Sequence, residues 1–500
     1  MTRSRRSRAE TGHEPRFKPE ETPSQDDEMN QRLQDTEAER LARGGPVRSL
    51  FRWFASGRNA DPGRMPPVAR LPRLRTTLRE ALAGSGGEVS ARQRMVSLAQ
   101  QYRVLDDDGR QDFLSLLATE FGPDESGVNR AIQSYLAQDG DAGRRRAEQT
   151  LRLALASPRT KIMKQFNLLP EGVKFLVDLR ADVLRFRAEL PELEALDDEL
   201  FSLFANWFDV GFLELRRISW DSPAALLERL IQYEAVHEIR SWNDLRHRLD
   251  SDRRCYAFFH PRMPDEPLVF VEVALVQHLA ADVQHLLDES KPSSDPAQAT
   301  TAIFYSISNT QPGLRGVSFG GFLIKRVVEQ LHAELPRLRT FATLSPLPGF
   351  RRWLDARLTI RDETLFTPAE RTRLTAVSGA GDPFEALRGL LATPEWHEHP
   401  DLRDALAPAL TRLAARYLVN EKEAGRPLDA VARFHLGNGA RLERVNWMAD
   451  ASARGLRQSA GVMVNYLYKL DDIESNHEAF ARDGRVIVSN GVLRLVKQQR

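Results

Sequence analysis

Two short motifs place a serine and a histidine where both could act on one substrate. Ser345 lies in FATLSPLPGF, at the end of a β-type run and next to Pro346 and Pro348, which keep the backbone in a rigid, non-helical turn. His435 lies between apolar neighbours in FHLGNGARLERV, just before a glycine-rich bend. A hydroxyl can orient a substrate group, and an imidazole can transfer a proton near neutral pH. Taken singly, a turn serine and a core histidine remain the alternative interpretations.

A glycine-rich stretch, RGVSFGGFLI at residues 315–324, precedes an amphipathic run that predicts a helix. Backbone N–H groups at a helix start, unobstructed by side chains, can bind a diphosphate. The spacing excludes a P-loop, because Lys325 follows the last glycine by four residues, and it does not match the dinucleotide motif G-x-G-x-x-G. An ordinary turn is the alternative. The candidate binding residues are Arg315, Gly316, Val317, Ser318, Phe319, Gly320 and Gly321.

The sequence does not predict a metal site. His397 and His399 are two residues apart, which does not place them on one face of a helix. Cys255 is the single cysteine, so an intrachain disulfide and a cysteine-based zinc site are both excluded. We therefore assign no metal ligand.

The composition and the net charge of the chain limit the kinds of partner that we expect it to bind. The 500 residues are 41% hydrophobic and 28% charged, as in a soluble globular protein, and the formal net charge of +1 gives no general reason to bind nucleic acid. No apolar run approaches the roughly 18 residues of a membrane span. The arginine-rich start lacks the apolar core of a secretory signal and soon carries acids such as Glu10 and Glu14. We expect a cytoplasmic protein with no nucleic-acid or membrane partner.

The elements that must position these residues fall into three parts. Residues 1–74 are predicted to be a disordered or linker segment, because residues 1 to about 48 are polar and poor in large apolar side chains and the stretch ASGRNADPGRMPPVARLPR is typical of a linker. Residues 75–205 carry apolar residues at three- and four-residue spacing, which predicts a helical domain. Residues 206–500 combine β-rich runs typical of strands with stretches that have the three- and four-residue spacing of helices. Strands are expected in RRCYAFFH, EPLVFVEVAL, ATTAIFYSIS, RLRTFATLS, GARLERVNWMA and GVMVNYLYKL, and helices at 367–424. The first two strands should form a hairpin around HPRMPD, and the whole is an α+β protein of two domains.

Together these motifs resemble the malonyl-CoA decarboxylase family. FYSISNTQPGLRGVSFGGFLIKRVV, FATLSPLPGF and FHLGNGARLERVNWMADASARGLRQSAGVMVNYLYKL carry the resemblance, in order and at familiar spacing. It implies a helical domain used in self-association, as a homotetramer or dimer of dimers, and a catalytic domain of GCN5-related acetyltransferase-like fold. RGVSFGGFLI follows the R/Q-x-x-G-x-G/A pattern of the pyrophosphate loop of that fold, with Ser318 in place of its first glycine.

The resemblance also implies an activity. Malonyl-CoA would be converted to acetyl-CoA and CO2, in malonate or fatty acid metabolism, with no metal or organic cofactor, because coenzyme A is part of the substrate. Ser345 and His435 would be the catalytic pair, Ser345 as proton acceptor and His435 as the acid that protonates the product enolate. Both would contact the substrate, and Arg315 to Gly321 would bind its coenzyme A part.

Two departures from the family pattern stand out. Animal relatives often carry glutamate at the position of Ser318, and the C-terminal LVKQQR lacks their SKL-type peroxisomal signal. Two other functions fit the same elements. An acyl-CoA N-acyltransferase would need an amine acceptor site and a base, and a non-enzymatic acyl-CoA-binding scaffold would bind without turnover.

Overall fold

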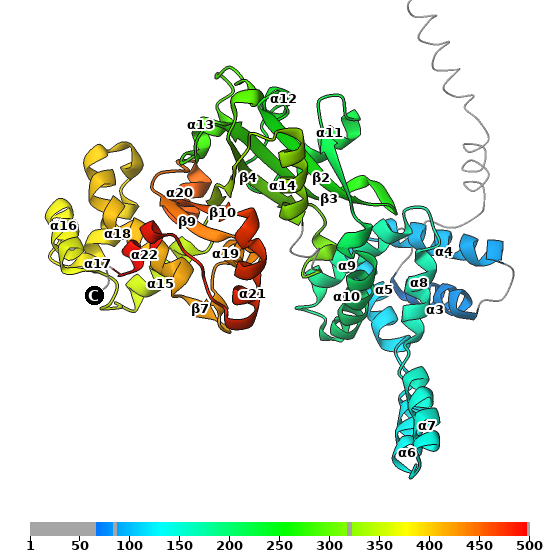
Figure 1. The fold of residues 1–500 in the computed structure, drawn as a ribbon. Coiled ribbons are helices and arrows are strands. Elements are labelled where there is room, and N and C mark those ends of the chain that lie inside the picture. The colour runs from blue at the N-terminus through cyan, green and yellow to red at the C-terminus, as the bar shows by residue number, and fades with distance from the viewer. Residues whose placement is uncertain (1–66, 84–87, 318–322, 498–500) are drawn as a thin grey trace, which may run out of the picture. The chain divides into compact units, whose positions relative to one another are not determined.

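The computed structural model describes residues 67–83, 88–317 and 323–497, which belong to one compact unit, residues 66–500 (Figure 1). The first part is helical, as predicted. Its helices are α3 (Pro67–Ala83), α4 (Glu88–Arg103), α5 (Asp107–Glu120), α6 (Glu125–Leu136), α7 (Asp141–Ala154), α8 (Pro158–Phe166), α9 (Gly172–Phe186) and α10 (Glu194–Trp207). Helix α3 begins inside the predicted linker 1–74, and its first residue is a proline, which fits the first turn of a helix. The remainder of that linker lies outside the described residues.

Helices α6 and α7 form a hairpin that extends away from the other helices of this part (Figure 1). Each buries a single residue, Ala131 in α6 and Ala147 in α7. By contrast, α9 buries most of its length, from Val173 to Phe186, and its apolar side chains share one continuous core with the sheet that follows. Helix α9 therefore connects the helical part to the rest of the molecule.

The second part is built on an eight-stranded sheet in the order β1-β2-β3-β4-β5-β10-β6, with β9 also paired to β10. The strands are β1 (Glu214–Ile218), β2 (Arg253–His260), β3 (Met263–Val276), β4 (Thr301–Asn309), β5 (Thr340–Thr343), β6 (Ser345–Pro346), β9 (Arg441–Asn446) and β10 (Met463–Tyr468). The predicted β2–β3 hairpin is confirmed, with a shorter turn than HPRMPD, because Met263 already pairs with His260. The predicted α+β organisation is confirmed.

Helices and one small strand pair surround this sheet. The helices are α11 (Ala224–Tyr233), α12 (Trp242–Arg248), α13 (Val283–Leu287), α14 (Leu323–Glu334), α15 (Phe350–Thr359), α16 (Pro368–Ser378), α17 (Pro383–Ala392), α18 (Pro400–Val419), α19 (Ala430–Gly437), α20 (Ala453–Ser459), α21 (Ile473–Asp483) and α22 (Asn490–Lys497). The helices predicted at 367–424 are α16 to α18, and the pair β7 (Lys422–Glu423) and β8 (Arg426–Pro427) follows them. No helix of the described chain has both the length and the apolar character needed to cross a bilayer.

One irregularity of the sheet creates room for a site. Strands β4 and β5 pair in parallel only from Thr301 to Phe304, opposite Thr340 to Thr343. Beyond Phe304, β4 carries one extra residue relative to β3, a β-bulge that bends the strand. The chain after β5 continues into β6, which pairs with β10 instead of β4. The two strands therefore separate at their carboxyl ends, where ligands of open sheets commonly bind.

Candidate active site

Ser345 and His435 meet at this separation of the strands. Ser345 is the first residue of β6, and His435 lies in the last turn of α19, a helix that begins at the side-chain cap of Asp429. The Oγ of Ser345 is 3.1 Å from the Nε2 of His435, and both side chains are buried. The turn that follows uses Gly439, whose φ of +80° is the left-handed conformation that favours glycine.

Two further side chains extend this contact into a chain of hydrogen bonds. Ser345 Oγ donates to Thr343 Oγ1 over 2.8 Å, and Thr343 Oγ1 also accepts the backbone N–H of Tyr466. The hydroxyl of Tyr468 lies 2.8 Å from His435 Nδ1. Because the proton of Ser345 is directed to Thr343, His435 donates from Nε2 to Ser345, and Nδ1 accepts from Tyr468. The proton of the imidazole therefore lies on the side of the serine.

The imidazole of His435 is held in a dry environment. Its ring stacks on Tyr466 with centroids 4.6 Å apart, and Phe434 contacts it edge-on at 5.1 Å. Burial lowers the pKa of His435 to about 3, so the ring is neutral at physiological pH. Burial also raises the pKa of Tyr468 well above its usual value. A negative charge brought next to the ring would oppose the effect of burial and raise the pKa of His435.

A cavity of about 270 Å³ opens onto Ser345 and His435. Of the described residues that line it, none is a lysine or an arginine. Most of its wall is apolar: Val236, Phe304, Ile307, Pro346, Ala430, Val431 and Phe434 line it, together with Tyr305 and Asn309. A carboxylate that entered this cavity would lose water and find no cation to replace it.

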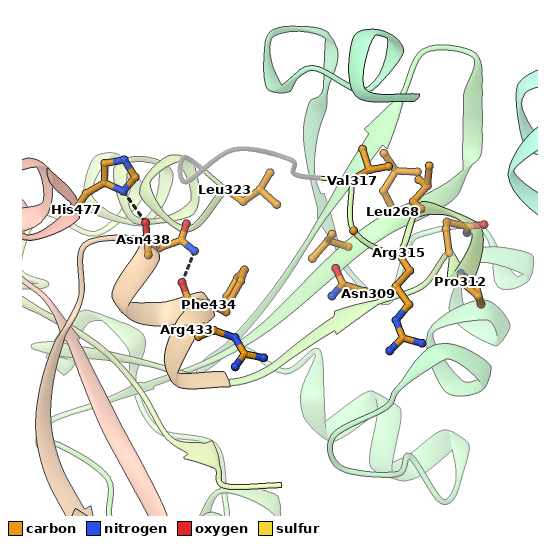
Figure 2. A pocket seen from close by; sticks show the side chains of 15 residues that line it. Leu268, Asn309, Pro312, Arg315, Val317, Leu323, Arg433, Phe434, Asn438 and His477 are labelled. Carbon is orange, nitrogen blue, oxygen red and sulfur yellow. Dashed lines mark hydrogen bonds between the residues drawn. The ribbon is translucent and has the colours of Figure 1, made fainter. Parts of the chain in front are cut away.

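A larger cavity of about 560 Å³ adjoins the first, and Asn309 and Phe434 line both (Figure 2). Three of the predicted phosphate-site residues, Arg315, Gly316 and Val317, lie in its wall. Figure 2 shows Arg315 facing Arg433, Asn438 and His477 across this space. Gly316 has a φ of +85°, which explains the glycine. The other predicted residues, Ser318 to Gly321, lie outside the described residues.

The family of the chain follows from its similarity to known proteins. The C-terminal domain of malonyl-CoA decarboxylase matches residues 211–500, and the N-terminal domain of the same family matches residues 121–208. The mitochondrial malonyl-CoA decarboxylase of Anser anser anser is 37% identical over 424 residues, 82% of this chain and 84% of the relative. That of Rattus norvegicus is 40% identical over 405 residues, 78% of this chain and 82% of the relative.

The chain belongs to the malonyl-CoA decarboxylase family. Among solved structures, malonyl-CoA decarboxylase from Rhodopseudomonas palustris is 45% identical with a TM-score of 0.78, covering 85% of this chain and 99% of that one. Malonyl-CoA decarboxylase from Agrobacterium vitis is 42% identical with a TM-score of 0.76 and the same coverage.

In this member of the malonyl-CoA decarboxylase family, the serine and the histidine that the motifs singled out lie next to each other in the fold. The structure brings Ser345 and His435 into contact, while their catalytic roles stay predictions. Sequence reasoning missed Thr343, Tyr466 and Tyr468. A signal was present, because residues two apart on a strand share a face, so the run TLS aligns Thr343 with Ser345, and YLY aligns the two tyrosines. Among the described residues, no group of three or more acidic, histidine or cysteine side chains is arranged to hold a metal ion.

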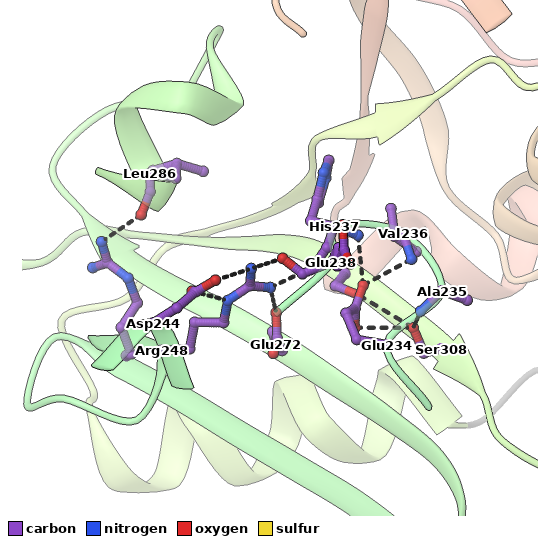
Figure 3. Close-up of polar contacts among 12 residues, drawn as sticks. Glu234, Ala235, Val236, His237, Glu238, Asp244, Arg248, Glu272, Leu286 and Ser308 are labelled. Atoms are coloured by element: carbon purple, nitrogen blue, oxygen red, sulfur yellow. Dashed lines mark hydrogen bonds and ion pairs between the residues drawn. The ribbon is translucent and has the colours of Figure 1, made fainter. Parts of the chain in front are cut away.

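A short segment before α12 forms part of the apolar wall (Figure 3). The carboxylate of Glu234 accepts hydrogen bonds from the backbone N–H groups of Val236 at 2.8 Å and His237 at 2.7 Å. The hydroxyls of Ser306 and Ser308, from β4, donate to the same carboxylate. The strand that carries the bulge thus also fixes Val236 in the wall of the smaller cavity.

Arg248 of α12 secures the other end of that segment (Figure 3). Its guanidinium donates to the backbone carbonyls of His237 at 2.9 Å and Glu238 at 3.1 Å, and it pairs with Asp244 and Glu272. Burial raises the pKa of Glu272 to about 8, and the guanidinium opposes that shift. Because Arg248 holds the backbone of this segment, we assign it a structural part in the site.

Proposed function

We propose that the chain converts malonyl-CoA to acetyl-CoA and CO2, with Ser345 and His435 at the reacting centre. The observation that carries this proposal is the buried Ser345–His435 contact, 3.1 Å long, in the wall of an apolar cavity that adjoins a larger one. A thioester in that cavity would present its malonyl group to both side chains, while its coenzyme A part would occupy the larger space.

The apolar cavity favours loss of CO2. The carboxylate of the substrate lies β to a thioester carbonyl, so breaking the bond to CO2 leaves the electron pair in a thioester enolate, and no organic electron sink is needed. A carboxylate surrounded by Val236, Ile307 and Val431 loses its hydration, and the reaction moves that charge towards the thioester oxygen. We therefore propose no metal or organic cofactor.

The enolate must then receive a proton at its α-carbon. His435 carries its proton on Nε2, the nitrogen that faces Ser345 and the cavity. The charge of the substrate carboxylate raises the pKa of the ring, so the ring takes up a proton from solvent when substrate binds; the imidazolium then gives its Nε2 proton to the α-carbon and returns to the neutral form. One proton is consumed in each turnover, and the hydroxyl of Tyr468 keeps the ring oriented. Ser345 orients the malonyl carboxylate and shares its proton with Thr343.

Incubation of the purified protein with malonyl-CoA alone tests the proposal. We expect stoichiometric CO2 and acetyl-CoA without an amine and with a chelator present. A requirement for an amine acceptor would favour the N-acyltransferase, and binding of the thioester without turnover would favour the scaffold. Both alternatives are less well supported, since the relatives named above are decarboxylases and their similarity extends over most of this chain.

We also propose that the chain self-associates through the hairpin of α6 and α7, as a dimer of dimers or another homotetramer. The hairpin exposes four large apolar side chains, which is unusual for a helix pair that protrudes: Ile132, Leu136, Leu153 and Leu155. A second copy of the same hairpin could cover them. For location we propose the cytoplasm, in contrast to the mitochondrial relatives of goose and rat, with a part in malonate or fatty acid metabolism.

A further inference from the structure

Arg180 of α9 makes contacts that reach out of the helical part. Its side chain is 3% exposed, and its Nη1 donates to the backbone carbonyl of Gly313 over 2.8 Å and to that of Arg315 over 3.0 Å. Both carbonyls belong to the segment that lies between β4 and α14 and lines the larger cavity. One guanidinium therefore holds two backbone carbonyls of the loop.

The position of Arg180 is itself fixed by α10. Its Nε donates to Oδ1 of Asp197 over 2.7 Å, and Asp197 is buried. The other oxygen of that carboxylate accepts from Arg187 over 2.9 Å, on the exposed side. The buried ion pair with Asp197 holds the guanidinium of Arg180 in this position. If Arg180 lost its bond to either carbonyl, one of its buried N–H groups would have no hydrogen-bond partner.

The backbone of the loop also packs closely on these helices. A Cβ at Gly313 would lie 1.7 Å from the carbonyl oxygen of Val177, so α9 and the loop touch without side chains between them. The ring of Phe201 lies 5.4 Å from the Arg180 guanidinium, and its edge would be 3.6 Å from a Cβ at Gly316. The loop is thus seated on α9 and α10 along its length from Gly313 to Gly316.

We infer that Arg180 is a positioning residue for coenzyme A binding, and that the helical part forms one support of the coenzyme A site. The nature of the ligand rests on the proposed function. Arg180 does not line the cavity, so it acts through the backbone of Arg315 and Gly316. A loop that is already held in its binding shape does not have to be ordered when the ligand arrives, and this raises affinity without a direct contact.

The test compares two arginines that pair with the same carboxylate. Arg180→Met keeps most of the apolar stem and removes the donors to Gly313 and Arg315. We expect a KM for malonyl-CoA raised about tenfold or more, with kcat within about twofold of wild type. Arg180→Lys, which keeps the charge and can reach one carbonyl, should lie in between. Arg187→Met, which removes the exposed partner of Asp197, should leave both constants nearly unchanged.

Calorimetric binding of free coenzyme A separates this inference from the proposed function. Weaker binding to Arg180→Met than to Arg187→Met supports the inference even if the wild-type protein fails to release CO2. If Arg180→Met does not fold, the double variant Arg180→Met, Asp197→Asn removes both buried charges and takes its place. Wild-type KM and wild-type coenzyme A affinity in a folded Arg180 variant would overturn the inference.

Discussion

The Nε2 of His435 lies 3.1 Å from the Oγ of Ser345, although 90 positions separate the two residues in the chain. The contact depends on β10, which pairs with β5 and β6 along one edge and with β9 along the other. Ser345 opens β6, and the two tyrosines of β10 hold the imidazole by stacking and by a hydrogen bond. The proposed catalytic pair is therefore positioned by the sheet and by one short helix.

Removing the imidazole should lower the rate of the chemical step. His435→Asn keeps some hydrogen bonding but cannot carry the proton, so kcat should fall on the order of 10²- to 10⁴-fold. Ser345→Ala should also lower kcat, with a smaller change in KM. Since both act on one substrate group, the double variant should lose less than the product of the two effects. Steady-state decarboxylation measures this, with coenzyme A binding as control. A wild-type rate in His435→Asn would show that the histidine is only a core residue.

Thr343 should matter through its hydroxyl. Thr343→Val keeps the shape but removes the acceptor for Ser345 and for the N–H of Tyr466, so kcat should fall about tenfold while KM changes little. Thr343→Ser should restore most of the rate. Thr301→Val, a buried threonine at the other end of the same β4–β5 pairing, is the matched control. Equal kcat values for Thr343→Val and the control would contradict the proposed direction of the hydrogen bonds.

Acid should destabilise the fold partly through His435. Its pKa is about 3 in the folded protein and about 6.5 when unfolded, so between these values the unfolded chain binds a proton that the folded one does not. Stability is fully present above that window and falls as pH drops through it. Between pH 7 and 5 this group should remove about 2 kcal/mol. Burial lowers the pKa of His237 to about 4, with the same sign.

Chemical unfolding at pH 7 and pH 5 measures this effect. His435→Asn should lose less stability than wild type over that interval, and the remaining acid sensitivity should include the share of His237. If both proteins lose the same stability on acidification, the imidazole of His435 is not buried as described.

The glycine-rich motif predicts a binding defect without a folding defect. In Gly320→Asp, a side chain and a negative charge would oppose a diphosphate at the start of the helix. The KM for malonyl-CoA should rise strongly, and the melting temperature should stay near that of wild type. A folded variant that binds coenzyme A as wild type does would mean that the stretch is merely a turn.

The exposed face of the α6–α7 hairpin should control self-association. Leu136→Lys together with Leu153→Lys places two charges on side chains that are 66% and 69% exposed, so the monomer fold should tolerate them. Light scattering should then report a smaller particle. Leu168→Lys, at a similarly exposed leucine outside the hairpin, is the control, because that residue is 64% exposed. An unchanged particle size in the hairpin variant would exclude this surface.

The amino-acid sequence by itself determined the local elements and the residues able to do chemistry. The three- and four-residue spacing of apolar side chains specified α5 and α9, and the β-branched and aromatic residues of GVMVNYLYKL specified β10 as a strand, because both signals are properties of neighbouring residues. The motifs also singled out Ser345 and His435.

Only the tertiary structure decided what these residues touch. Placing β10 between β9 and the β5–β6 segment brings Tyr468 to His435, and seating the loop on α9 brings Arg180 to Gly313, 133 positions away. Such contacts depend on strand order and helix packing, which join segments that share no local pattern. The neutral state of His435 likewise follows from burial by β10 and Phe434, and burial is a property of the assembled fold.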